Sequence, residues 1–204
     1  DNKTVIMASI YSHLDKKVYT KEEISEEVCK CAEAGASIVH FHINKLNNGI
    51  EGLEDVLNLI DHNCDIIVDF SISDYKEVVM RCPKYLKKNT VFAAMHADSC
   101  EVFGNVYTQT EEAIDIARDY LKNQIIPEIC IFSKEGLNIA ERITHTFSKK
   151  TYCCIYLDYP NCIQLSDEIL EWACNRLNQD SFVSMAVYKN KSYETIRKVV
   201  KAGG

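Results

Sequence analysis

The stretch Ala34-Gly-Ala-Ser-Ile-Val-His-Phe-His-Ile43 joins one predicted element to the next and indicates the fold class. Gly35 ends an amphipathic helix, and the apolar, β-branched run that follows it reads as a buried strand. Turn residues in Asn44-Lys-Leu-Asn-Asn-Gly49 then close that strand. A helix, a glycine stop, a continuous apolar strand and a polar turn are typical of one unit of a parallel α/β sheet.

Two histidines, His40 and His42, lie two positions apart in this strand. Alternate side chains of a strand point to the same face, so both imidazoles leave one side of the predicted sheet near the C-terminal end of the strand. Two imidazoles about 6–7 Å apart at Cα can bind one metal ion through nitrogens at about 2.0–2.1 Å. The spacing also fits two buried histidines that are hydrogen-bonded in a core or an interface. A metal site would need further ligands from elsewhere in the fold.

The alternation of apolar runs and amphipathic stretches continues along the chain. The stretches predicted as strands are Thr4–Ile10, Ser37–Ile43, Asp65–Ser71, Thr90–Ala97, Ile126–Phe132, Thr151–Tyr159 and Phe182–Tyr188. Helices are predicted between Thr20 and Gly35 and over Leu53–His62, Asp74–Arg81, Glu111–Asn123, Leu137–Phe147, Asp167–Leu177 and Tyr193–Ala202. Thr20 and Glu23 form a capping box at the start of the first helix, and Ser166 and Ser192 are the predicted caps of the last two.

Seven consecutive strand–helix units predict a parallel sheet covered by helices. Their even spacing, without a Gly-x-Gly-x-x-Gly turn after the first strand, favours a (β/α)8 TIM-type barrel over a dinucleotide-binding sheet. The chain stops at Val-Lys-Ala-Gly-Gly204, where an eighth strand would begin. We therefore expect residues 1–204 to form a single barrel domain that is incomplete at its C-terminus.

The composition is that of an ordinary globular protein, with 47% hydrophobic and 26% charged residues among 204. A net charge of −7 and the lack of a basic stripe argue against a nucleic-acid partner. No apolar run approaches the roughly 18–20 residues needed to span a bilayer, and the N-terminus lacks a signal-peptide pattern. The ten cysteines are scattered and contain no Cys-x-x-Cys pair, which predicts reduced packing residues and a cytoplasmic protein.

Further candidate residues lie near the predicted C-terminal strand ends, where the reacting groups of such barrels gather. Asp69 and Ser71 end the third strand, and Glu128 lies in the fifth. In the fourth, His96 and Asp98 are two positions apart and share a face, and they could supply either a third metal ligand or a carboxylate that orients a ligating imidazole. His96 could equally be an ordinary hydrogen-bonded strand histidine. Glu128 would be either a buried acid with a shifted pKa or a partner in a helix-cap bond.

The segment Ala32-Glu-Ala-Gly-Ala-Ser-Ile-Val-His-Phe-His42 resembles the β-keto acid cleavage enzymes, a family that includes the 3-keto-5-aminohexanoate cleavage enzyme of lysine fermentation. In that family a similar run ends strand two of a (β/α)8 barrel. Gln124-Ile-Ile-Pro-Glu-Ile-Cys-Ile-Phe132 is similar to the family's strand five, and Val106–Thr110 and Lys201–Gly204 fit in order and spacing.

The resemblance implies a zinc-dependent exchange in which a β-keto acid and acetyl-CoA give acetoacetate and a new CoA ester. Zn2+ would be held by His40 and His42 with a carboxylate from strand eight, and would polarise the β-keto oxygen as a Lewis acid. Ser71 is the expected substrate contact, and Glu128 the expected catalytic residue, a buried structural or polarising acid. The resemblance also implies a homo-oligomer, in the form of a tetramer, without a nucleic-acid or membrane partner.

The chain departs from the family's pattern at most strand ends. The departures are Ile43–Lys45 after strand two, Asp69–Asp74 after strand three, Ala94–Ser99 after strand four, Cys130 in place of a second strand-five glutamate, and Leu157–Asn161 and Val187–Asn190 in place of glycine-rich ends. Three functions therefore stay open. They are a divergent active member of the family, a catalytically degenerate zinc-binding paralogue with a binding or regulatory role, and another metal-dependent barrel hydrolase.

Overall fold

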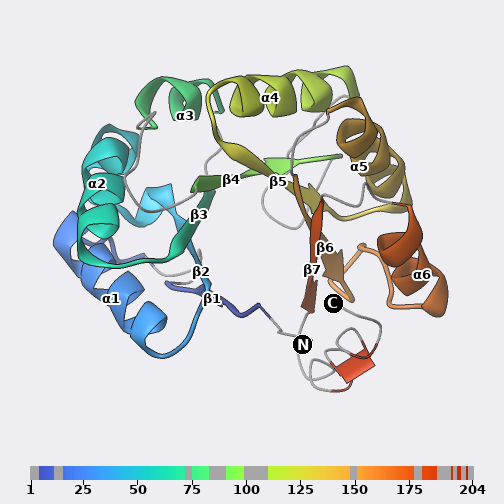
Figure 1. Ribbon diagram of the computed structural model, residues 1–204, viewed down its shortest axis with the longest axis horizontal. Coiled ribbons are helices and arrows are strands. Elements are labelled where there is room, and N and C mark those ends of the chain that lie inside the picture. Colours follow the sequence, from blue (N-terminus) through green and yellow to red (C-terminus); the bar gives the residue numbers. More distant parts are fainter. Residues whose placement is uncertain are drawn as a thin grey trace. The chain divides into compact units, whose positions relative to one another are not determined.

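The computed structural model describes residues 5–11, 16–71, 75–82, 91–98, 110–147, 151–176 and 181–187, and the isolated positions 194, 197, 198 and 201. Strands and helices alternate along these residues, which gives an α/β fold (Figure 1). The strands are β1 (Met7–Ser9), β2 (Ile38–His42), β3 (Ile67–Ser71), β4 (Val91–His96), β5 (Ile126–Ile131), β6 (Tyr152–Leu157) and β7 (Phe182–Val187). The helices are α1 (Lys21–Glu33), α2 (Leu53–Asn63), α3 (Tyr75–Arg81), α4 (Thr110–Lys122), α5 (Lys134–Thr146) and α6 (Asp167–Asn175), with short 3-10 turns η1 (Ile43–Lys45) and η2 (Gly49–Gly52).

The seven strands are hydrogen-bonded in the order in which they occur in the sequence, from β1 to β7. The pairs β1–β2, β2–β3, β3–β4, β5–β6 and β6–β7 are parallel. The predicted parallel α/β architecture is therefore confirmed. A dinucleotide-binding sheet reverses its strand order at a switch point, and the sequential order is the one that a barrel of βα units requires.

The chain divides into two compact units. The N-terminal unit comprises Val5–Ala94 and Lys122–Ile126, and the C-terminal unit comprises Asp1–Thr4, Met95–Leu121 and Pro127–Gly204. The division falls within β4, so that β1, β2 and β3 belong to the first unit and β6 and β7 to the second. Within the described residues, no helix combines the length and the apolar character needed to cross a bilayer.

The first helix of the N-terminal unit begins and ends where the sequence predicts. The Thr20 hydroxyl accepts a hydrogen bond from the Glu23 amide at 3.1 Å, and the Glu23 carboxylate accepts one from the Thr20 amide at 2.8 Å. This reciprocal pair satisfies two of the amides that a helix start leaves exposed. At the other end, Gly35 has a φ of +100°, a left-handed conformation that glycine adopts without steric cost. The turn at Gly35 directs the chain into β2.

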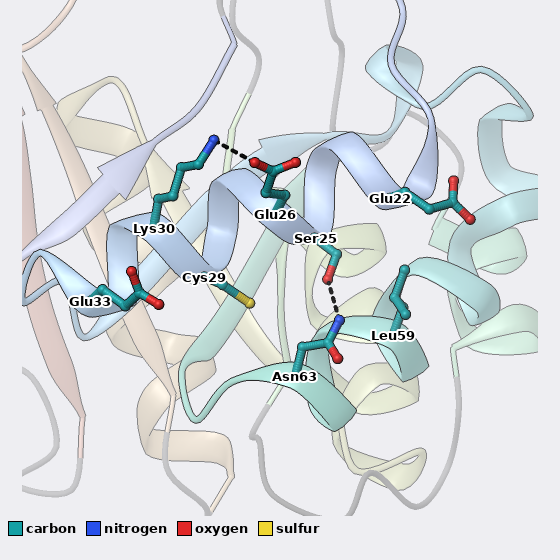
Figure 2. Close-up of a pocket in the computed structure, with 8 residues that line it drawn as sticks. All are labelled: Glu22, Ser25, Glu26, Cys29, Lys30, Glu33, Leu59 and Asn63. Carbon is teal, nitrogen blue, oxygen red and sulfur yellow. Dashed lines mark hydrogen bonds and ion pairs between the residues drawn. The ribbon is translucent and has the colours of Figure 1, made fainter.

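A groove of about 490 Å³ lies between α1 and α2 (Figure 2). The two helices are linked by a hydrogen bond of 3.2 Å from the Asn63 amide group to the Ser25 hydroxyl, and Lys30 pairs with Glu26 at 2.8 Å along α1. The groove is lined by Glu22, Ser25, Glu26, Cys29, Lys30, Glu33, Leu59 and Asn63. It contains none of the predicted site residues.

Two elements of the C-terminal unit differ in length from the sequence prediction. The helix predicted over Leu137–Phe147 begins earlier, at Lys134, because the Ser133 hydroxyl accepts from the Gly136 amide at 3.1 Å and caps it. The strand predicted to reach Tyr159 ends at Leu157, because Asp158 has a φ of +60° and turns the chain. The Asp158 carboxylate then accepts a hydrogen bond from the Leu165 amide at 3.2 Å.

The predicted cap of α6 is confirmed, since the Ser166 hydroxyl accepts from the Ile169 amide at 3.3 Å. The last predicted helix, Tyr193–Ala202, and its cap Ser192 lie almost wholly outside the described residues; positions 194, 197, 198 and 201 are helical.

Candidate metal centre

His40 and His42 project from the same face of β2, as their spacing predicts. Val39 and Phe41 alternate with them and are fully buried on the opposite face, whereas both histidines are partly exposed. The two imidazole rings lie edge to face, with centroids 5.1 Å apart and an interplanar angle of 86°. An apolar side of the strand thus packs into the core while the other side presents two imidazole rings to one region of space.

Each histidine is paired with a polar residue of the neighbouring strand. In the β2–β3 ladder, His40 lies opposite Asp69, and His42 lies opposite Ser71. The Nδ1 atom of His40 is 2.6 Å from the Asp69 Oδ2 atom, and that of His42 is 2.7 Å from the Ser71 hydroxyl. An ionised carboxylate only accepts hydrogen bonds, so with Asp69 ionised the proton of this bond belongs to the His40 Nδ1 atom. The register of the β2–β3 ladder therefore places a hydrogen-bonding partner beside each imidazole.

These contacts determine which ring nitrogen can ligate a metal. A histidine whose Nδ1–H is held by a carboxylate, carbonyl or hydroxyl binds a metal through Nε2. His40 has this arrangement with Asp69, while the Nδ1 atom of His42 contacts the Ser71 hydroxyl, which can donate or accept. His40 and Asp69 also belong to a group of side chains spaced closely enough to share one ion. Imidazole nitrogens suit Zn2+ and its borderline neighbours in the first transition series. The donor set therefore fits the zinc ion that the family resemblance implies.

The predicted substrate contact, Ser71, belongs to this cluster, at the C-terminal end of β3. Its hydroxyl engages the His42 ring, so the structure brings Ser71 together with the two predicted metal ligands. Sequence reasoning named Asp69 only as one of several polar residues near strand ends. The signal that was missed is the Asp69-x-Ser71 spacing, which repeats the spacing of His40-x-His42 on the adjacent strand.

The predicted catalytic acid, Glu128, is located in β5 of the C-terminal unit and is 2% exposed. It lies opposite Tyr152 in the β5–β6 ladder. Burial, with the nearby Glu128 carboxylate as a second cause, raises the pKa of the Cys153 thiol to about 12. The sequence predicts Glu128 to be either a buried acid or a partner in a helix-cap bond. Its position within β5 and its burial agree with the first of these.

His96 and Asp98, which the sequence places on one face, have separate environments at the end of β4. The His96 ring packs edge-on against Phe132, with centroids 5.2 Å apart, and its Nδ1 atom is buried without a hydrogen-bond partner in the described part of the chain. Asp98 instead accepts a hydrogen bond from Ser133 at the start of α5. An added Cβ at Gly136 would lie 2.8 Å from the Asp98 Cγ atom, so the carboxylate sits directly against the first turn of that helix. The Asp98 carboxylate therefore lies at the N-terminus of α5, which attracts negative charge, and the orientation of a ligating imidazole by Asp98 stays a prediction.

The burial of His96 predicts a dependence of stability on pH. Burial lowers the pKa of His96 below its ordinary value of 6.5, so the unfolded chain takes up this proton at a higher pH than the folded protein does. The free energy of unfolding should therefore fall as the pH decreases from about 7 through 6.5 toward the folded-state pKa, with a slope from this group of at most about 1.4 kcal/mol per pH unit. Urea unfolding at a series of pH values between 7 and 5 measures this dependence of the free energy of unfolding on pH.

His96→Gln is the matched variant, because glutamine stays neutral over this range. We expect its unfolding free energy to change less with pH than that of the wild type, while Asp98 is present in both proteins and cancels in the comparison. Equal slopes for the two proteins would contradict a depressed pKa at His96.

The chain also matches the model of a known protein family. The family model described as beta-keto acid cleavage enzyme matches residues 17–204. This range includes both histidines, Asp69, Ser71 and Glu128. No curated protein matches the chain.

Proposed function

Because the chain belongs to the β-keto acid cleavage enzymes, we propose that it catalyses a zinc-dependent exchange in which a β-keto acid and acetyl-CoA give acetoacetate and a new CoA ester. The observation that carries the proposal is the histidine pair on β2, in which each Nδ1 atom is hydrogen-bonded to the register partner on β3.

In this proposal, His40 and His42 hold the ion through their Nε2 atoms. Bound zinc would supply a Lewis acid that polarises the β-keto oxygen and stabilises negative charge that develops on it. Asp69 and Ser71 hold the Nδ1 side of the two rings, so that each presents the same nitrogen throughout a turnover. The Ser71 hydroxyl has two lone pairs and one proton, and it can contact His42 and a substrate oxygen together.

Glu128 is the acid that the proposal assigns to polarising or positioning the substrate. Its burial supports this role, because a carboxylate removed from water interacts strongly with nearby charge. The same proposal includes complete closure into a (β/α)8 barrel, a carboxylate from strand eight as the third zinc ligand, and a tetrameric assembly, all of which follow from the family. It also includes a cytoplasmic location, which follows from the scattered cysteines.

The reaction is tested with the zinc-loaded chain, acetyl-CoA labelled with 13C in both acetyl carbons, and a panel of β-keto acids. By the stoichiometry of the exchange, the acetyl carbons leave in acetoacetate while the acyl group of the keto acid leaves as a CoA ester. Mass spectrometry should detect doubly labelled acetoacetate and an equal amount of the new, unlabelled ester. Both products should be absent with His42→Ala and present with His62→Ala, whose histidine is exposed on α2.

A zinc-loaded chain that forms neither product with any keto acid of the panel would overturn the exchange reaction. That result would favour the degenerate zinc-binding paralogue, which shares the metal site but not the chemistry. Release of free CoA without a new ester would instead point to hydrolysis.

A further inference from the structure

Asp69 is the residue of the metal centre whose role is least evident from the sequence. It is fully buried, at 0% exposure, in the middle of β3. A carboxylate removed from water so completely is costly unless a charged or polar partner compensates for the lost hydration. The His40 ring, 2.6 Å away, is such a partner, and the strand register sets the two residues opposite each other.

Asp69 could either bind the metal together with His40 Nδ1 or hydrogen-bond to that ring nitrogen. The short distance between Asp69 and His40 distinguishes these two roles. Two ligands of one tetrahedral zinc ion, at bond lengths of about 2.0–2.2 Å, lie about 3.4 Å apart. The Nδ1 and Oδ2 atoms are 2.6 Å apart, a hydrogen-bond distance that leaves no space for an ion between them. The two nitrogens of an imidazole point in divergent directions, so an ion on Nε2 lies on the far side of the ring from this oxygen.

We propose that Asp69 is a positioning residue that fixes the tautomer and orientation of His40, and that it contributes more to metal affinity than Ser71 does at His42. This inference rests on the metal site of the proposed function and not on the reaction. A buried carboxylate is a stronger acceptor than a hydroxyl, and it holds the Nδ1 proton of His40 and increases the electron density at Nε2. Ser71 can act as donor or acceptor, so it restrains the His42 tautomer less.

The zinc affinity of the full chain, measured by competition with a chromophoric chelator, tests whether Asp69 contributes more to metal binding than Ser71 does. We expect Asp69→Asn, which keeps the shape of the side chain, to bind zinc about 10- to 100-fold more weakly than the wild type. Ser71→Ala should have the smaller effect, and His40→Ala the largest. Circular dichroism of each variant checks that its fold is intact.

A second measurement needs no substitution at the buried carboxylate. Long-range 1H–15N correlation spectra of the metal-free wild type, with His40→Ala for assignment, report which nitrogen of each imidazole carries the proton. We expect His40 to be the Nδ1–H tautomer. The Nε2–H tautomer at His40 would overturn the proposal.

The remaining outcomes separate this inference from the proposed reaction. Zinc affinity of Asp69→Asn within threefold of the wild-type value would remove the positioning role and leave the reaction untouched. A loss as large as that of His40→Ala would make Asp69 a direct ligand and would also overturn the inference. Weakened zinc binding in Asp69→Asn, together with a wild type that forms no CoA ester, would support the positioning role and overturn the reaction.

Discussion

Replacing either His40 or His42 by alanine is expected to remove bound zinc from the protein. In the proposed site each imidazole would supply one ligand from β2, and a site that loses one of them would keep too few protein donors on that strand to hold the ion. Substitution of a partner that only orients a ligand costs about 10- to 100-fold in metal affinity, so loss of the ligand itself should exceed about 100-fold. Metal analysis after dialysis without chelator should give about one zinc per wild-type chain and almost none in either variant.

The matched control is His62→Ala, which removes an exposed histidine from α2 of the same unit. Its zinc content should equal that of the wild type. If His40→Ala and His42→Ala both keep their zinc, the ion is bound elsewhere and the β2 site is wrong. A wild type that binds no zinc under these conditions would leave the pair as partly exposed histidines with a hydrogen-bonding role, close to the alternative that the sequence left open.

The parts of this centre that the sequence predicts are those that depend on one segment of chain. Gly35 adopts the left-handed φ that ends α1 without steric cost, so this helix stop depends on no tertiary contact. The apolar run after it forms β2. Once that strand exists, its alternation alone places His40 and His42 on one face. The capping box of Thr20 and Glu23 is local in the same sense, and the structure confirms it.

The parts that the sequence does not predict depend on which residues of distant segments become neighbours. The bond between His40 and Asp69 joins residues 29 positions apart, and a shift of the β2–β3 register by one residue would move Asp69 to the other face. Asp98 follows β4 and accepts a hydrogen bond from Ser133 at the start of α5, 35 positions away in the sequence. The helix start offers amides and a hydroxyl together, and only the folded chain brings it within reach of the carboxylate.

The two sides of β2 therefore have separable tasks, one chemical and one structural. The His40 and His42 side carries the candidate metal centre, and its residues add little apolar packing. The opposite side carries Val39 and Phe41, both fully buried. Phe41 lies between the two histidines in sequence and packs into the core on the opposite face of the strand. Its ring centroid is 6.3 Å from that of Phe70 on β3. Stability and metal binding should thus respond to different substitutions within one five-residue strand.

Phe41→Ala is expected to lower the free energy of unfolding by about 3–5 kcal/mol, the usual cost of deleting a fully buried aromatic side chain and leaving a cavity. Urea unfolding should be measured with EDTA present, because a metal that binds only the folded state would otherwise add its own stabilisation and mask part of the loss. Met80→Ala is the control, since Met80 is 67% exposed on α3 and its removal should change stability by no more than about 0.5 kcal/mol. A double-mutant cycle with Phe70→Ala should show coupling, because two rings in contact leave one shared cavity. A loss below about 1 kcal/mol in Phe41→Ala, far under the cost of such a cavity, would show that the rear face of β2 does not anchor the histidine pair.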